Sequence, residues 1–395
     1  MNITKKTGQA AVLSALFPWV GIGLFNIDSK PYPLVFSILF IAACYRNIKL
    51  PPNTGLVSGF VFIGLLLALA CSDSPISFLS LRSIYNYLSF FVFLIFFYNY
   101  LIRFAFPYRL IIFSGALWIL AGIIETQTPE IINLLSPIRT SASRGITSLS
   151  PEPTFFAIYL FFSSWLLLIH KNYSLRDQSV IFWLQILSIM LLAQSTMGAL
   201  YLILALIFAM LGTLLSLKIR KSAFYILISA IVFISTSALL AYPYFQGSRL
   251  ITVIGRVAET TDFYMIFHHD ASMNARLEHV VFALHGTVLN GLLPGGFDTF
   301  DHSRPYLLKF YNGFFWYSGA SLKIMSWLGD WVYSLGLFGI LALAILFYTA
   351  AKPTIWGITE VTFLYILLLS AIPLAFPLIP MLIASFIFYK YNPRT

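Results

Sequence analysis

The sequence predicts an all-α polytopic membrane protein with about 12 transmembrane helices. Of its 395 residues, 59% are hydrophobic and only 10% are charged, and the mean hydropathy is +0.86. A soluble globular fold could not bury this much apolar surface. We therefore expect residues 1–395 to form a single integral membrane domain. The formal net charge of +10 does not indicate a nucleic-acid partner, because the basic residues are scattered singly between apolar runs.

Apolar runs bounded by polar residues, proline or glycine define the expected spans. The run from Ser179 to Leu217 is too long for one straight crossing and is interrupted at Gln194-Ser195-Thr196, so we expect two crossings there. The full set of expected spans is 8–27, 32–45, 55–71, 84–102, 109–125, 153–170, 180–194, 197–217, 223–243, 330–350, 355–371 and 374–389.

Alternation of these spans across the membrane places most basic residues on one face, together with both termini. The positive-inside rule predicts that this face is cytoplasmic. Two long loops, at about 126–152 and 244–329, then lie on the outer face, where we expect the function to be. The inner loops are short and contain no glycine-rich phosphate-binding loop, so we expect no cofactor.

The first outer loop ends in a compact polar motif. Arg144-Gly145 is followed by Glu152-Pro153-Thr154, and another apolar run begins directly afterwards. Proline suits the first turn of a helix, where its missing N–H is no loss, and the helix dipole favours a carboxylate at this end. We therefore expect the Glu152 carboxylate at the N-terminal end of a membrane helix, with Arg144 a short loop away. The same residues also fit an ordinary polar loop before a helix.

The second outer loop contains a segment with helical periodicity. Its apolar residues recur at spacings typical of one face of an amphipathic helix. Arg276 and His279 lie along one flank of this apolar stripe, and Glu278 and His285 lie along the other. An interfacial helix on the outer membrane surface would also explain the pattern, without a catalytic role. The stripe consists of Met273, Leu277, Val280, Val281, Leu284 and Val288.

Three motifs, in this order, resemble the O-antigen polymerase (Wzy) family within the larger O-antigen polymerase and ligase superfamily. The first is Arg-Gly-x(6)-Glu-Pro-Thr at 144–154. The second begins at Arg276, runs RLEHVVFALHGTVLNGLLPGGFDTF and contains the Gly-Gly-Phe turn 295–297. The third, 333–339, is similar to the Leu-Gly-Leu-x-Gly opening of the span after that loop. The chain departs from the superfamily patterns at Met325, where ligases usually carry histidine, and at Thr196, where many members carry arginine.

The resemblance implies a polymerase of the bacterial inner membrane. It would transfer a growing glycan from undecaprenyl diphosphate to an incoming lipid-linked repeat unit at the periplasmic face. Its partners would be the undecaprenyl-diphosphate-linked oligosaccharide donor and acceptor and membrane lipid, and could include a chain-length regulator protein. The nearest alternative is an O-antigen ligase that transfers glycan to lipid A core, which Met325 disfavours. The alternative from another class is a transporter or flippase for the lipid-linked sugar. Ion-coupled transport generally needs ionisable residues within spans, where Glu360 is nearly the only candidate.

The expected residue roles follow from the chemistry of a diphosphate leaving group. Planar guanidinium groups suit phosphate oxygens, and the attacking sugar hydroxyl needs a general base. We expect Arg144 and Arg276 to bind the leaving group and Glu152 to act as the base, with His279 or Asp298 as further candidates for the base. The loop residues expected to contact substrate or lipid headgroups, or else to be solvated charges, are Arg249, Arg256, Arg304 and Lys309, and Asp298 is also a candidate substrate contact.

Two groups of side chains in the second outer loop could be considered as metal ligands, His268-His269-Asp270 and Asp298 with Asp301 and His302. Adjacent histidines cannot both point at one ion without an unusual backbone, and no Cys or His spacing supports a site. We therefore expect no metal.

Overall fold

The computed structural model describes residues 2–21, 30–136, 145–170, 176–215, 271–316 and 324–392, and these residues form helices and no β-strand. Helices occur at eleven of the expected spans, while the expected span 223–243 lies outside the described residues. These helices are α1 (Asn2–Ala15), α2 (Tyr32–Ala43), α3 (Thr54–Cys71), α4 (Phe78–Arg103), α5 (Tyr108–Glu125), α7 (Pro153–Ile169), α8 (Arg176–Leu191), α9 (Thr196–Leu215), α15 (Trp327–Ala350), α16 (Ile355–Leu368) and α17 (Leu378–Tyr391).

Five of these helices, α3, α4, α5, α9 and α15, are long and apolar enough to cross a membrane. The others are shorter; α17, for example, has 14 residues and would be about 21 Å long, less than the hydrocarbon thickness of a bilayer. The long apolar helices are consistent with a membrane-embedded helical protein. The number of crossings, the two outer loops and the orientation of the termini stay predictions.

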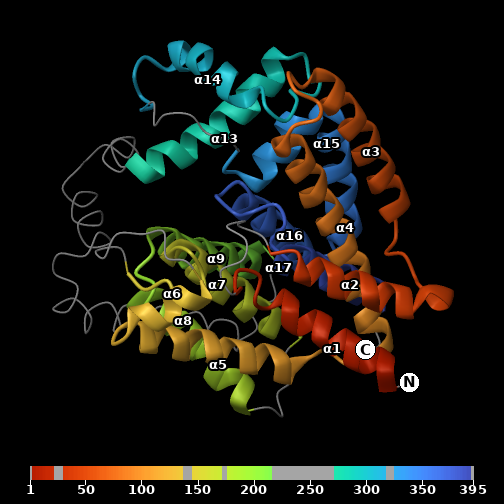
Figure 1. Cartoon of the computed structure of the whole chain (residues 1–395), viewed down its shortest axis with the longest axis vertical. Coiled ribbons are helices and arrows are strands. Elements are labelled where there is room, and N and C mark those ends of the chain that lie inside the picture. The colour runs from red at the N-terminus through yellow and green to blue at the C-terminus, as the bar shows by residue number, and fades with distance from the viewer. Residues whose placement is uncertain are drawn as a thin grey trace.

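The helices form two groups joined by α17 (Figure 1). One group contains α3, α4 and α15, which lie along the right of the molecule, and the other contains α5, α7, α8 and α9. Helix α17 packs against both α4 and α7. Every side chain of α17 from Leu378 to Phe388 is buried, as expected for a helix that is apolar on all sides and lies in the core.

A helix is present where the amphipathic helix was expected, and its apolar stripe is not buried within the protein. Helix α13 (Ala271–Leu289) buries a face that includes Asn274, Glu278 and His279, and it packs against α15 and α14 (Phe300–Leu308). On the stripe, Leu284 and Val288 are exposed. Asn274 on the buried face has hydrogen-bond partners that offset its burial: its amide donates to the Phe314 carbonyl and accepts from the Trp316 N–H.

Helix α15 is interrupted at Gly336, which adopts φ 57° and ψ −139°. A glycine-rich turn of the predicted second outer loop packs against this interruption. The Gly295 N–H donates to the Tyr333 carbonyl at 2.8 Å, and the Leu337 N–H donates to the Leu292 carbonyl at 2.7 Å. A β-carbon at Gly336 would lie 2.5 Å from the Leu292 oxygen, so only glycine fits. The second and third sequence motifs are therefore joined by backbone hydrogen bonds.

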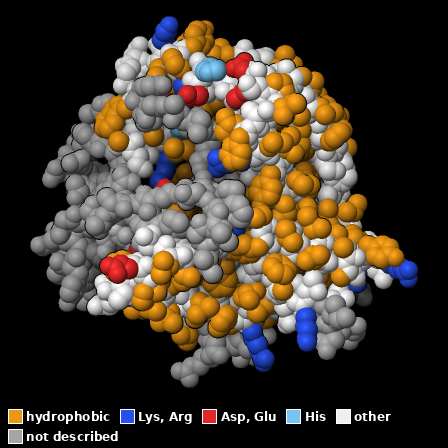
Figure 2. Space-filling view, in the orientation of Figure 1, with side chains coloured by type: hydrophobic (Ala, Val, Ile, Leu, Met, Phe, Trp, Pro, Cys, Tyr) orange, Lys and Arg blue, Asp and Glu red, His pale blue; other side chains and the backbone are white. Residues whose placement is uncertain are grey.

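Two short helices and two single 3-10 turns complete the described chain. They are α6 (Pro129–Leu135) and α14 in the predicted outer loops, and η1 (Tyr45–Asn47) and η3 (Lys309–Tyr311). Figure 2 shows hydrophobic side chains over the right of the molecule, where α3 lies. Asp, Glu and His gather near α14 at the top, and Lys and Arg are found mainly along the edges of the view, at the bottom, the right and the top. This separation of charge from a wide apolar surface is the pattern of a protein embedded in lipid.

Candidate functional site

A cavity of about 650 Å³ lies where the first turns of α4, α7 and α15 face α13 and the turn before α14. Three of the residues predicted from sequence line it, namely Glu152, Arg276 and Asp298. Further charged or titratable side chains on its wall are Arg82, Asp301, His302 and Asp330. The cavity is therefore lined by residues of both helix groups and has both cationic and acidic side chains.

The first and second sequence motifs meet in this cavity. The Arg276 guanidinium on α13 donates from Nη2 to the Thr154 hydroxyl at 3.3 Å, across 122 positions of sequence. Glu152, two residues before Thr154, is the extended residue that precedes α7, with φ −145° and ψ 148°, and its side chain does not cap the helix. Pro153 occupies the first turn of α7, as predicted. The Glu152 carboxylate is thus free of a capping role and lies on the same cavity wall as Arg276.

The segment before Glu152 is packed inside the protein instead of forming an open polar loop. Thr147, Ser148 and Ser150 are fully buried. The Ile146 N–H donates to the Leu192 carbonyl at 2.9 Å. Gly145 has φ 93°, and a β-carbon there would collide with a backbone oxygen at the end of α8. The glycine of the Arg-Gly pair is therefore required by close backbone approach.

A buried carboxylate that the sequence did not single out holds this segment. Glu125, the last residue of α5, is 8% exposed. The Thr147 N–H donates to both of its oxygens at 3.1 and 3.0 Å, and the Thr147 hydroxyl donates at 2.8 Å. The Ser148 N–H also donates to it. Since hydrogen bonds to an ionised acceptor are stronger than neutral ones, Glu125 fixes the path of the chain towards Glu152.

Asp298 lines the cavity but also anchors the glycine-rich turn to the end of α3. Its two carboxylate oxygens accept from the N–H groups of Asp73 and Ser74, at 3.0 and 2.8 Å. The neighbouring Phe297 N–H donates to the Ser72 hydroxyl at 2.9 Å. Asp298 is therefore placed to position the turn, and its predicted roles as base or substrate contact stay predictions.

His279 lies behind the cavity wall and does not line the cavity. It is fully buried, and its Nδ1 accepts from the Met325 N–H at 3.2 Å. Met325, which stands where the superfamily's ligases usually have histidine, does line the cavity. His279 thus supports the segment that leads into α15.

Arg304 is fully buried and holds α14 against α13, and it is not among the residues that line the cavity. Its guanidinium contacts the Glu278 carboxylate at 2.9 Å and the Asp301 carboxylate at 3.2 Å. Burial raises the pKa of Glu278, while the hydrogen bond and charge of Arg304 act in the opposite direction. Asp301 joins this ion-pair network to the cavity, because its side chain lines the wall.

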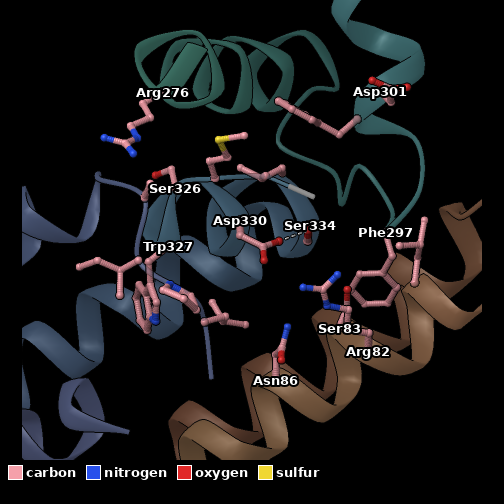
Figure 3. Close-up of a pocket in the computed structure, with 18 of the residues that line it drawn as sticks. Arg82, Ser83, Asn86, Arg276, Phe297, Asp301, Ser326, Trp327, Asp330 and Ser334 are labelled. Atoms are coloured by element: carbon pink, nitrogen blue, oxygen red, sulfur yellow. Dashed lines mark hydrogen bonds between the residues drawn. The ribbon is translucent and has the colours of Figure 1, made fainter. Parts of the chain in front are cut away.

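Arg82 and Asp330 are cavity residues that the motifs did not indicate. Figure 3 shows Arg82 pointing from α4 towards Asp330 on α15, while Arg276 extends from α13 on the side of Ser326. The Ser334 hydroxyl donates to Asp330 Oδ1 at 2.7 Å. The expected span 84–102 began too late to include Arg82, because α4 begins at Phe78. A lone arginine near the end of an apolar run looks like an interfacial anchor, so the sequence carried little signal for it.

Lys309 is exposed in η3 and is not among the residues that line the cavity. The remaining predicted residues lie outside the described part of the chain. These are Arg144, Arg249 and Arg256, together with His268, His269 and Asp270. Within the described ranges, no group of three or more His, Cys, Asp or Glu side chains is arranged to hold a metal ion.

The chain was also compared with known proteins. No protein-family model matches it, and no curated protein matches it either.

Proposed function

We propose that this protein is a membrane glycan polymerase of the O-antigen type, which extends a polysaccharide from undecaprenyl-diphosphate-linked donors. The observation that supports the proposal most is the meeting of Arg276 with Thr154 beside Glu152 in one cavity. These residues belong to two motifs whose order resembles that of the polymerase family, and a shared cavity is what a common catalytic role requires.

The proposed reaction is a displacement at the anomeric carbon of the donor glycan. A sugar hydroxyl at the non-reducing end of the incoming repeat unit forms the new C–O bond. The bond between the anomeric carbon and the diphosphate oxygen breaks, and undecaprenyl diphosphate leaves with the electron pair. The hydroxyl proton passes to a general base, for which Glu152 is the proposed residue.

Arg276 is the proposed partner of the leaving group. A preorganised guanidinium stabilises negative charge where it develops, at the diphosphate oxygens, without rearrangement during the reaction. Arg82 offers a second guanidinium from the opposite wall of the cavity. Arg144 keeps its predicted role in the same task. Energy comes from the activated lipid donor, so the reaction needs no nucleotide.

The location of the cavity suits a lipid-linked diphosphate. The cavity is lined by the first residues of α4 and α15, two of the helices long and apolar enough to span a membrane. A polyprenyl chain would lie in the hydrocarbon region while its diphosphate lies at the interface, level with such helix ends.

A gene deletion followed by gel analysis of surface polysaccharide tests the reaction class. Lipid A core capped by a single repeat supports the polymerase. Unsubstituted core with accumulated lipid-linked polymer would identify a ligase instead, and the absence of any intermediate on the outer face would identify a transporter.

Complementation with Glu152→Gln tests the assigned base, because this change removes the charge and keeps the size. We expect a large loss of polymer at normal protein level. Glu130→Gln is the matched control, since Glu130 is an exposed carboxylate on α6 that does not line the cavity. Normal polymer with Glu152→Gln would show that Glu152 is only a helix-start residue.

A further inference from the structure

A second cavity, of about 530 Å³, lies at the opposite end of the helix group that contains α7. It is lined by the last turns of α7 and α9 and the first turns of α8 and α16, whereas the first cavity is lined by the start of α7. Most of its wall is aromatic or aliphatic, with Trp165, Trp183 and Trp356 among the lining residues. Its walls therefore suit a hydrocarbon chain.

One carboxylate stands at the edge of this apolar cavity. Glu360 of α16 lines it and also lines a smaller neighbouring cavity of about 240 Å³. Among the described residues, the Trp165 indole N–H donates a hydrogen bond to Oε1 of the Glu360 carboxylate, at 3.3 Å. A carboxylate next to hydrocarbon is costly unless a cation or several donors accompany it. A cationic group that enters either cavity could form an ion pair with the Glu360 carboxylate.

The smaller cavity also contains a cation, at a different place on its wall. Lys352 lines it, and the Lys352 ammonium lies 5.5 Å from the centre of the Tyr389 ring, also a lining residue. Lys352 is exposed, and its charge acts on Glu360. The smaller cavity thus presents an ammonium at the protein surface and a carboxylate towards the apolar cavity.

We propose that the two cavities together bind a zwitterionic aminophospholipid from the leaflet at this end of the protein. One acyl chain occupies the apolar cavity, the lipid phosphate contacts Lys352, and the lipid ammonium contacts Glu360. An anionic phospholipid lacks the ammonium and would place its phosphate near the Glu360 carboxylate with no added cation to offset the repulsion. The preference for an amine headgroup therefore comes from Glu360, and the affinity for phosphate from Lys352.

The test is lipid retention by the purified, delipidated full chain in detergent, read by native mass spectrometry. The probes are phosphatidylethanolamine and phosphatidylglycerol with the same acyl chains, each added at equal concentration. We expect one phosphatidylethanolamine to be retained in preference to phosphatidylglycerol. Equal retention of the two phospholipids, or retention of neither, would overturn the proposal.

Three variants locate the site. Glu360→Gln keeps an acceptor for Trp165 but removes the charge, and should weaken phosphatidylethanolamine binding by about thirtyfold or more, as when one partner of a desolvated charge pair is lost. Lys352→Gln should weaken both phospholipids to a similar degree. Ala209→Trp, which fills the apolar cavity, should abolish retention.

Glu130→Gln serves as the control, because Glu130 is exposed and lines neither cavity. It should retain phosphatidylethanolamine like the unchanged protein. If Glu360→Gln elutes as a folded protein and still prefers phosphatidylethanolamine, Glu360 does not select the headgroup and the proposal fails.

Discussion

Replacement of Glu125 should show how strongly the segment before Glu152 depends on one buried carboxylate. In Glu125→Ala, the N–H groups of Thr147 and Ser148 lose their acceptor inside the protein. A buried donor left without a partner costs about 1–3 kcal/mol. The two backbone donors together give an expected loss of about 2–6 kcal/mol in the free energy of unfolding.

Glu125→Gln should be milder, for a reason visible in the geometry. With its amide oxygen in the place of Oε2, Gln can still accept from the N–H groups of Thr147 and Ser148. Its amide nitrogen, in the place of Oε1, can then donate to the Thr147 hydroxyl, which contacts Oε1 in the unchanged protein. The cost is the difference between charged and neutral hydrogen bonds, about 1 kcal/mol each.

The assay has two parts. Reversible unfolding in mixed micelles gives the free energy of unfolding, and polymer formation from purified lipid-linked repeat units gives the rate per folded protein. Because the segment leads directly to Glu152, Glu125→Ala should lower the rate of the folded fraction as well. Glu130→Ala, at an exposed position on α6, is the control and should change neither quantity. Unfolding free energies within about 0.5 kcal/mol for Glu125→Ala and the unchanged protein, or equal losses for Ala and Gln, would refute the reasoning.

Three other changes have defined outcomes. Arg276→Ala should slow polymer formation by roughly 30- to 1,000-fold, and Arg276→Lys should be less impaired. The double variant with Arg144→Ala should slow the reaction by less than the product of the two single effects. Near-normal polymerisation by Arg276→Ala would remove Arg276 from the site. Gly336→Ala should lower the free energy of unfolding by about 2 kcal/mol or more, because only glycine adopts this backbone readily. Gly59→Ala should not destabilise the fold, because a β-carbon added there would meet no side chain and no other segment within 4 Å. Similar unfolding curves for the two variants would contradict this. Burial raises the pKa of Glu278, so the folded protein releases this proton at a higher pH than the unfolded chain does. The resulting stabilisation is fully present below the ordinary glutamate pKa and is lost as pH rises through the raised pKa. Glu278→Gln should flatten this part of the pH dependence of the unfolding free energy, and an unchanged slope would argue against the assignment.

The positions of the helices were largely determined by the sequence itself. The predicted apolar runs became helices such as α3, α4, α5, α15 and α17, which are 14 to 26 residues long. A long run of apolar side chains leaves water as a helix, either in the protein core or in lipid, because the helix satisfies its own backbone hydrogen bonds. Periodicity also predicted α13 but not its buried face. That face carries Asn274 and Glu278, whose partners on other segments make burial of polar groups acceptable.

The candidate site was predicted only as separate pieces. Glu152 and Arg276 were chosen from local motifs, and their presence in one cavity depends on the packing of α13 against α15 and on the contact of Arg276 with Thr154 at the start of α7. Arg82 and Glu125 belong to no recognisable motif. A single charged residue at the end of an apolar run has the same sequence pattern whether its side chain anchors the helix at the membrane interface or points into a site. Sequence periodicity reports which side chains prefer to leave water, because this preference is local. Which buried charge meets which partner is a property of segments far apart in the chain, so only the tertiary structure decides it.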